Sequence, residues 1–258
     1  MSEVDLSIFE DIGLEYPLVA VGFSAQEPDD VPRLSAKLAL CEMLREAQQR
    51  GPFYAAAADH GCGAGPFVLG HESVDPVFES GRIGPELGVY RDEAANRRVY
   101  EELPRLPAGK ARFVRFSRLE DLTFDPDLVV VTARPSEAEI LTRAHGYANG
   151  ASWEARGTTV IGCAYLYAYP IASGRMNILI TGLHHGMRAR GVFPEGLLLV
   201  SIPKAALVDI AVNLEQMIKQ GLIDLPQYHW GREEHEKHMR TLAERLRKDL
   251  GQSATDGT

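Results

Sequence analysis

The hydrophobic positions of the chain fall into short apolar runs and longer amphipathic stretches. Runs rich in Val, Leu and Ile at 17–23, 127–133 and 197–202 are apolar at nearly every position, which predicts strands in the centre of a sheet. The stretch "ARFVRFSRL" (111–119) alternates between apolar and polar residues, as a half-buried strand does. The apolar segment "TTVIGCAYLYAYPI", which contains Cys163, predicts a further strand, as do "PFYAAAAD" and "MNILITGL".

Apolar residues spaced three and four positions apart predict amphipathic helices between these strands. Residues 32–51 show this spacing, and Gly51 is placed to end the helix. Residues 135–150 begin with a proline, carry acidic residues in the first turn and end at a glycine, which are the usual signals of helix boundaries. The pattern predicts three more helices, at 92–103, 204–221 and 232–250, the last of them strongly charged.

Together these elements predict an α+β fold. We expect a single compact core domain at 1–222, with a mixed β-sheet and packed helices, followed by a charged helix and a disordered tail at 223–258. The halves 14–110 and 111–222 resemble each other weakly: each has a strand, a helix that ends at glycine and a Gly-Cys pair in the same order. Chance explains this order as well as duplication does, because strand–helix units are common.

Composition narrows the classes of protein that the chain can belong to. The formal net charge of −9 over 258 residues disfavours a nucleic-acid-binding protein and docking to anionic membranes. The acidic first residues do not resemble a signal peptide, and no apolar run approaches 18 residues. Three cysteines, an odd and small number, are typical of a reducing compartment. We therefore expect a cytoplasmic protein without nucleic-acid or membrane partners.

The common catalytic and binding motifs are absent from the sequence. Pro66 occupies the position of the third glycine in what would otherwise read as a G-x-G-x-x-G dinucleotide fingerprint. Neither a phosphate-binding G-x-x-x-x-G-K-[ST] loop nor a G-x-S-x-G nucleophile turn occurs. His235 and His238 lie three residues apart on the charged helix near the C-terminus, where solvent exposure is a simpler interpretation than metal binding.

Chemistry-bearing residues gather in three segments. The loop "ADHGCGAGPFVLGHE" places Cys62 between glycines and close to His60. Cys163 lies in an apolar segment, and "GLHHGMRARG" (182–191) carries His184, Arg188 and a second arginine, Arg190. Thiolate and imidazole are ligands for zinc, copper and iron–sulfur clusters, and a guanidinium pairs with carboxylate or phosphate in a bidentate way.

Each cysteine also has a purely structural interpretation. Cys41 lies on an apolar helix face beside Leu38 and Leu44, which favours a small buried hydrophobic residue over a ligand. Cys163 is compatible with both interpretations. Cys62 has no apolar neighbours in the sequence, so a functional role is the better explanation for it.

In order along the chain, several segments resemble the domain-of-unknown-function 169 family. They are "YPLVAVGF", "CEMLREAQQRGPFYAAAADHGCGAGPFVLG", "PDLVVVTARPSEAEILTRAHGYANG", "GTTVIGCAYLYAYPIASGRMNILI" and "GLHHGMRARG", and the resemblance runs from about residue 14 to residue 220. It marks Cys41, Cys62 and Cys163, with Gly186 and Arg188 in the last turn. One departure is informative, because members resembling this family often carry a further cysteine where this chain has His184.

A cysteine-to-histidine exchange is one that a metal or cluster site accommodates, because both side chains donate a lone pair. The resemblance therefore implies a ligand set of Cys62, Cys163 and His184, with Cys41 as a possible fourth member. Such a set suits an iron–sulfur cluster or a single transition-metal ion with an open coordination position. The candidate catalytic residues are His60, His184 and Arg188, with Arg188 expected to point towards Cys62 and Cys163.

Three functions fit these residues. The first is a metal- or iron–sulfur-dependent protein, or enzyme, that acts on a small anionic molecule in a crevice lined by Cys, His and Arg. The second is a metal-free protein that binds a small molecule in the same crevice. The third is a thiol redox protein in which Cys62 and Cys163 pair with each other. The first two require that Cys62 and Cys163 converge with His184 near them, and a homo-oligomer is compatible with all three.

Overall fold

The computed structural model describes residues 6–71 and 76–250 of the chain. Its backbone divides into two compact units, residues 1–216 and residues 217–258. The predicted tail at 251–258 lies outside the described residues. The first unit contains the sheet and all three cysteines.

A six-stranded sheet forms the centre of the first unit, with the strand order β2-β3-β1-β4-β6-β5. The fold is α+β, as the sequence predicts. The runs that are apolar throughout form β1, β4 and β6, three of the four interior strands, because both of their faces are covered. The sheet is antiparallel at every pairing of the named strands rather than mixed. The strands are β1 (Val19–Ser24), β2 (Phe53–Ala56), β3 (Phe113–Arg118), β4 (Leu128–Ala133), β5 (Asn177–Ile180) and β6 (Leu198–Pro203).

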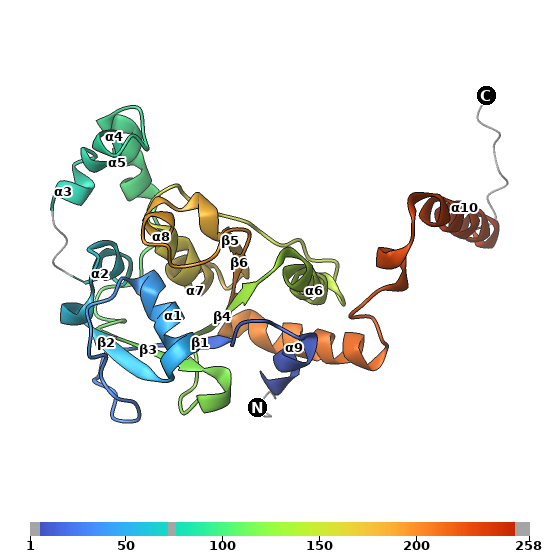
Figure 1. Cartoon of the computed structure of the whole chain (residues 1–258), viewed down its shortest axis with the longest axis horizontal. Coiled ribbons are helices and arrows are strands. Elements are labelled where there is room, and N and C mark those ends of the chain that lie inside the picture. The colour runs from blue at the N-terminus through green and yellow to red at the C-terminus, as the bar shows by residue number, and fades with distance from the viewer. Residues whose placement is uncertain (1–5, 72–75, 251–258) are drawn as a thin grey trace. The chain divides into compact units, whose positions relative to one another are not determined.

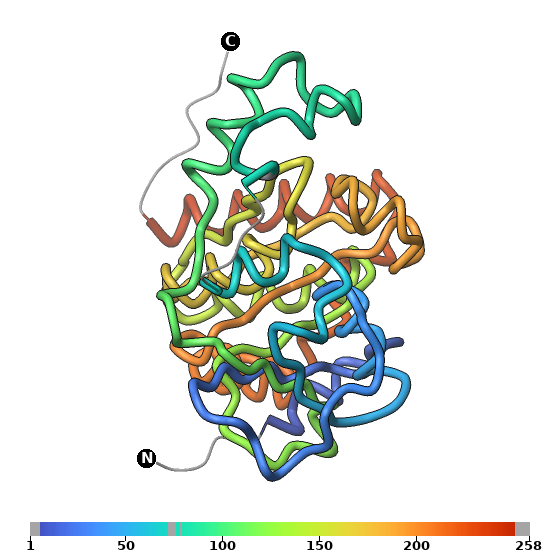
Figure 2. Tube along the Cα trace, turned by 90° about the vertical axis from the view of Figure 1, so that its left-hand side faces the viewer, coloured from blue at the N-terminus to red at the C-terminus, as the bar shows by residue number. Residues whose placement is uncertain are grey.

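Helices of the first unit, which excludes α10, lie around this sheet (Figure 1). α3, α4 and α5 gather at one end of the unit, where the rotated trace shows the same segment projecting (Figure 2). The C-terminal part of α5 reaches back to the core through Val99 and Tyr100. The helices are α1 (Leu40–Arg50), α2 (Ala64–Val68), α3 (Pro76–Glu79), α4 (Ile83–Glu86), α5 (Glu93–Glu102), α6 (Pro135–Gly146), α7 (Tyr169–Ser173), α8 (His185–Ala189), α9 (Lys204–Lys219) and α10 (Arg232–Asp249).

One face of the sheet carries the cysteines. Alternate residues of the strands, such as Val21, Phe116 and Leu199, pack with α1, α2 and the segment 163–168 in one hydrophobic cluster, as the two-residue period of a strand requires. α6 packs against β4 and β6, and α9 is joined to it by a hydrogen bond from Asn213 Nδ2 to the Ala144 carbonyl. Neither of these helices contributes to the cluster, so they cover the other face.

Two predicted elements differ from the structure. Residues 32–39 do not begin the first helix, because their backbone runs extended beside the Cys62 loop: the Leu38 N–H donates to the Asp59 carbonyl and the Gly61 N–H donates to the Leu38 carbonyl. These hydrogen bonds to a distant segment outweigh the helix propensity that the amphipathic spacing of residues 32–39 suggests. The predicted strand around Cys163 is wrong: residues Ala164–Ala168 form a π-helix that continues into α7. A short, wholly apolar run does not distinguish a strand from a buried helix.

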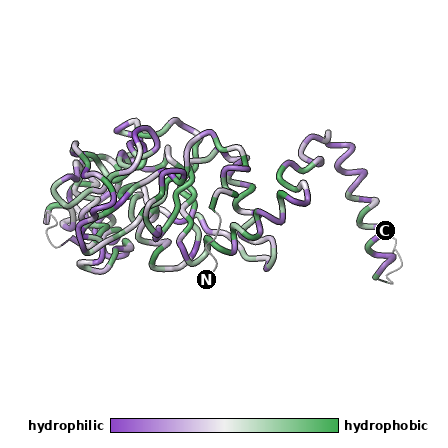
Figure 3. Tube along the Cα trace, turned by 90° about the horizontal axis from the view of Figure 1, so that it is seen from below, coloured by the Kyte–Doolittle hydropathy of each residue, from purple (hydrophilic) through white to green (hydrophobic). Residues whose placement is uncertain are grey.

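The second unit is dominated by α10. No residue of this helix is buried, and the tube coloured by hydropathy shows it as mainly hydrophilic (Figure 3). The rings of His238 and Trp230 are in tilted contact, with centroids 4.7 Å apart. Across the described residues, every helix is too short or too polar to cross a bilayer.

Candidate functional site

All three cysteines are free thiols, and each lies at or just before the start of a helix. Cys41 is in the first turn of α1, Cys62 comes two residues before α2, and Cys163 is the residue that caps the π-helical segment. Cys41 and Cys163 belong to the hydrophobic cluster, and Cys62 packs against it. The N–H groups at the start of a helix favour negative charge, but burial opposes it at Cys41 and Cys163.

The three thiols lie within electrostatic reach of one another. Burial raises the pKa of the Cys41 thiol to about 11, and the nearby Glu42 and Cys62 add to that shift. Burial also raises the pKa of Cys163 well above its usual value, with further contributions from Cys41 and Cys62. We call this group, Cys41, Cys62 and Cys163, the thiol cluster. Its members come from segments far apart in the sequence, and the close convergence of Cys62 and Cys163 on one ligand stays a prediction.

Two tyrosines line the thiol cluster. The pKa of Tyr100 is raised to about 12 by burial and by the nearby Tyr90, Cys62 and Cys163. Tyr167 is fully buried, donates a hydrogen bond of 3.2 Å to the Leu40 carbonyl, and has a pKa raised by burial and by Cys41 and Cys163. Both phenols therefore stay protonated at neutral pH, so they can donate hydrogen bonds.

The backbone leading into Cys163 is strained. Ile161 has a φ of 53°, a left-handed conformation that a β-branched residue rarely adopts. The π-helix that follows Cys163 is itself an uncommon element, frequent at functional sites. Such strain persists only where the surrounding structure holds it in place. Two uncommon backbone features therefore flank the same cysteine.

Two buried polar residues of the sheet support the π-helix. Ser201 and Asn177 are paired in register on β6 and β5, and both are completely buried. The Ser201 hydroxyl donates to the Leu166 carbonyl, and Asn177 Nδ2 donates to the Tyr165 carbonyl at 2.9 Å. These side chains accommodate carbonyls that an irregular helix leaves without a regular backbone partner.

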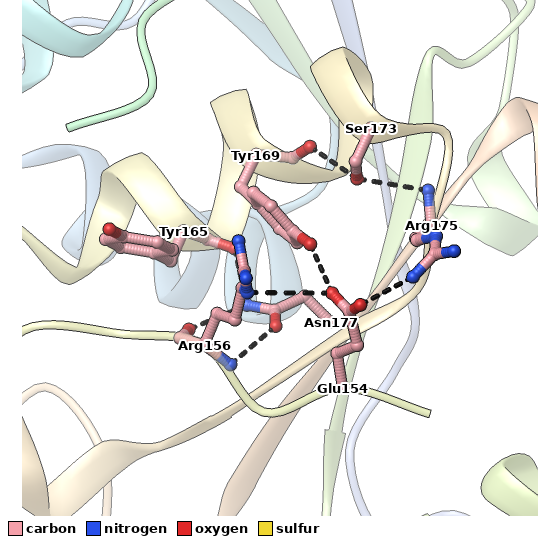
Figure 4. A network of polar contacts seen from close by, with 7 residues as sticks. All are labelled: Glu154, Arg156, Tyr165, Tyr169, Ser173, Arg175 and Asn177. Atoms are coloured by element: carbon pink, nitrogen blue, oxygen red, sulfur yellow. Dashed lines mark hydrogen bonds and ion pairs between the residues drawn. The ribbon is translucent and has the colours of Figure 1, made fainter. Parts of the chain in front are cut away.

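A polar network fixes the segment before Cys163 to the same helix (Figure 4). Asn177 is bonded to both the N–H and the carbonyl of Arg156, at 2.9 and 3.0 Å. The Glu154 carboxylate accepts hydrogen bonds from the Tyr169 hydroxyl and from Arg175, at 2.6 Å for the arginine. Residues 154–156 are thereby held to β5 and α7, which anchors the chain on its way to Cys163.

His184 packs against Gly162, the residue before Cys163. Its Nδ1 is 2.8 Å from the Thr158 carbonyl, and because a carbonyl only accepts, Nδ1 carries the proton and Nε2 the lone pair. A methyl group on Gly162 would come within 2.6 Å of His184 Nδ1, so the glycine is required for this close packing. Burial lowers the pKa of His184. His184 therefore supports the backbone of residues 158–162 as a neutral imidazole.

Of the two arginines, Arg190 is the one placed near a thiol. The positive charge of Arg190 partly offsets the rise in the pKa of Cys41 that burial causes. The Arg190 Nε lies 3.8 Å from the Glu42 carboxylate. The side chain of Arg188 is 70% exposed and pairs with Glu195 at 3.7 Å, so the structure does not place it in the expected orientation. The Glu42 carboxylate also accepts the Ala39 N–H at 2.6 Å at the start of α1.

His60 faces another histidine rather than a thiol. Its ring and that of His71 are 5.9 Å apart between centroids and nearly perpendicular. Burial, and to a smaller degree the charge of His71, lowers the pKa of His60 to about 4. Both ring nitrogens of His60 and Nδ1 of His71 are buried and without a hydrogen-bond partner in the described part of the chain.

Within residues 6–71 and 76–250, no three His, Cys, Asp or Glu side chains stand close enough to hold one metal ion together. The single-ion ligand set of Cys62, Cys163 and His184 therefore stays a prediction.

A family model covers most of the same chain. The model of the domain-of-unknown-function 169 (DUF169) family, described as uncharacterised ArCR, matches residues 7–213. The chain belongs to the DUF169 family. No curated protein and no solved structure matches it. The match spans all three cysteines and the sheet, so the thiol cluster lies within the family domain.

The sequence of this DUF169 protein did not indicate several residues of the site. Tyr100, Tyr167, Glu42, Asn177 and Ser201 were not predicted, because their positions depend on contacts between distant segments. Asn177 could have been recognised from the sequence, because it is a polar residue in an otherwise apolar strand. His71 was visible at the end of the Cys62 loop, but nothing in the sequence pointed to its pairing with His60.

Proposed function

We propose that the thiol cluster binds an iron–sulfur cluster. The observation that carries the proposal is that Cys41 and Cys163 belong to one hydrophobic cluster and Cys62 packs against it, all three as free thiols from separate segments of the chain. Thiolates are the usual ligands of iron–sulfur clusters, and three of them leave one iron with a position open to another ligand.

A cluster and a single ion need different spacings of their ligands. Ligands of one zinc-like ion lie within roughly 4 Å of one another, whereas thiolates around a four-iron cluster are roughly 6–7 Å apart. The described residues contain no group at the smaller spacing. The proposal therefore retains the cluster and gives less weight to a single transition-metal ion at these thiols.

The surroundings are suited to a negatively charged cofactor. The N-terminus of α1 and that of the π-helical segment carry Cys41 and Cys163, and Tyr100 is a protonated phenol beside the thiols. Such donors stabilise cluster sulfurs and thiolates. Because burial raises the pKa of Cys41 and Cys163, both thiols are protonated without a cofactor, and binding must release these protons.

A small anionic molecule is the ligand that we propose for the open position. Arg190 is 35% exposed and lies near Cys41. Its guanidinium can pair with the carboxylate or phosphate of a ligand when its ion pair with Glu42 opens. His184, as a neutral imidazole with a lone pair on Nε2, stays a candidate for a fourth ligand or a catalytic base. Catalytic roles for His60 and Arg188 remain predictions.

The test is the colour of anaerobically purified variants. Wild type is expected to absorb near 400 nm, and C41S, C62S and C163S are each expected to lose most of this absorbance. M187L is the matched control, since Met187 is a buried sulfur-containing residue of the same hydrophobic cluster but no thiolate. Equal absorbance in the cysteine variants and wild type would overturn the proposal.

A thiol redox function is the second candidate, favoured by the partial exposure of Cys62 beside two buried thiols. It predicts a colourless protein in which mild oxidation joins Cys62 to Cys163 or Cys41. Mass mapping of disulfides after oxidation distinguishes it from the cluster proposal, which predicts bleaching with loss of iron.

A further inference from the structure

We infer that His60 and His71 form a second site, which binds a borderline divalent transition-metal ion such as Zn²⁺. This site is separate from the thiol cluster and does not depend on the proposed function. It rests on the geometry of the two rings, on their unpartnered nitrogens and on a hollow that gives access to His71.

The two rings are prepared as ligands. His71 Nε2 lies 2.7 Å from the Ala111 carbonyl, so Nε2 carries the proton and the lone pair of the neutral ring is on Nδ1. A histidine that donates one ring N–H to a backbone carbonyl and keeps the other nitrogen free has the usual arrangement of a metal ligand. That free nitrogen, Nδ1, is buried and has no partner among the described residues.

The ring of His60 is held in place by packing, whereas that of His71 is held by a hydrogen bond. A Cβ atom on Gly65 would come within 2.6 Å of His60 Nδ1, so α2 packs directly against the ring. Both ring nitrogens of His60 are buried and have no partner among the described residues, so the nitrogen that carries the lone pair is available to a cation. Buried polar atoms without partners are uncommon and imply an unseen ligand or water.

The distance between the rings suits one shared ion. A metal–nitrogen bond is about 2.0–2.1 Å, and a ring nitrogen is about 1.1 Å from its ring centroid. Two imidazoles on one ion therefore have centroids roughly 5.2 Å apart at a tetrahedral angle and roughly 6.4 Å apart when opposite each other. The observed separation of 5.9 Å falls between these limits. A direct hydrogen bond between the rings would need a shorter contact, and none is formed.

A hollow of about 810 Å³, lined by His71, Arg112 and Phe113, adjoins the pair on the side of His71. The described residues supply no third protein ligand at ligating distance, so water or a small anion completes the coordination. Arg112 provides a positive charge beside such an anion. The site is therefore an open, exchangeable one rather than a closed structural zinc site.

The experiment measures the melting temperature of the full-length chain, freed of adventitious metal by a chelator, with and without ZnCl₂. Zinc is expected to raise the melting temperature of wild type by roughly 3–6 °C at saturation. H60F keeps the ring volume and removes the ligand, and H71Q keeps a donor for the Ala111 carbonyl. Both are expected to fold and to respond to zinc by less than about 1 °C.

Two controls exclude other sites. The double variant H235A/H238A removes the exposed histidine pair of α10, and C62S alters the neighbouring thiol; both are expected to retain the wild-type response to zinc. A response in H60F and H71Q equal to that of wild type would overturn the inference, and so would its loss in H235A/H238A. If C62S loses its colour but keeps its zinc response, the two sites are independent.

Discussion

At the scale of single residues, buried polar groups mark the places where this protein departs from an ordinary core. The thiol cluster, the His60–His71 pair and His184 are all close to glycines or to the start of a helix, where the backbone can approach a side chain. The sequence indicated the cysteines and histidines as reactive types. It could not indicate their partners, because an imidazole pair or a thiol cluster arises from contacts between distant segments.

His60 makes the stability of the protein depend on pH. Its pKa of about 4 in the folded protein lies below the ordinary value of about 6.5, so the unfolded chain takes up the proton first. The contribution of His60 to stability is complete above pH 6.5 and is lost as the pH falls towards 4. Wild type is expected to lose about 2 kcal/mol through this residue between pH 7 and pH 5.

H60F removes the titrating group and is the comparison for this prediction. Urea unfolding at pH 7 and pH 5, in the absence of metal, gives the free energy of unfolding for both proteins. H60F is expected to lose about 2 kcal/mol less than wild type over this interval. Identical losses would mean that His60 is not buried as a neutral ring.

At the scale of elements, the π-helix is the feature that the sequence could not predict. The apolar run around Cys163 satisfies both a buried strand and a buried helix, and only the contacts of Tyr165 and Leu166 with β5 and β6 decide between them. The extended residues 32–39 are a similar case, decided by pairing with the Cys62 loop. By contrast, α5, α6 and α9 were predicted closely, because glycine, proline and charge mark their ends.

The support of the π-helix by Ser201 can be measured against a matched serine. Ser201 and Ser173 both donate a hydroxyl to a carbonyl of this helical region, but Ser201 is completely buried and Ser173 is exposed. S201A leaves the Leu166 carbonyl without a partner in the core and is expected to cost about 1–3 kcal/mol. S173A exposes the freed carbonyl to water and is expected to cost less than about 0.5 kcal/mol.

Chemical denaturation of both variants tests this prediction, and the absorbance near 400 nm reports whether Cys163 has moved. Equal destabilisation by S201A and S173A would contradict the assigned role of Ser201.

At the scale of the whole molecule, the family domain and the charged C-terminal helix differ in how they are built. The domain buries two faces of a sheet, whereas α10 buries none of its own residues. The predicted division at residue 222 follows from this contrast in composition. The duplication of the halves 14–110 and 111–222 remains a prediction.

A chain ending at residue 222 is expected to fold with a melting temperature within about 3 °C of the full-length protein, because the deleted helix removes no buried residue. Differential scanning calorimetry of the two proteins measures the difference. A much lower melting temperature would show that α10 contributes to the stability of the core.

The central claim is that three cysteines gather to hold an iron–sulfur cluster, and the most direct test is the iron and acid-labile sulfide content of the full-length protein purified without oxygen. The account predicts about four iron and four sulfide per chain for a four-iron cluster, or about two of each for a smaller one. Wild-type protein that contains neither after anaerobic purification and reconstitution would contradict it.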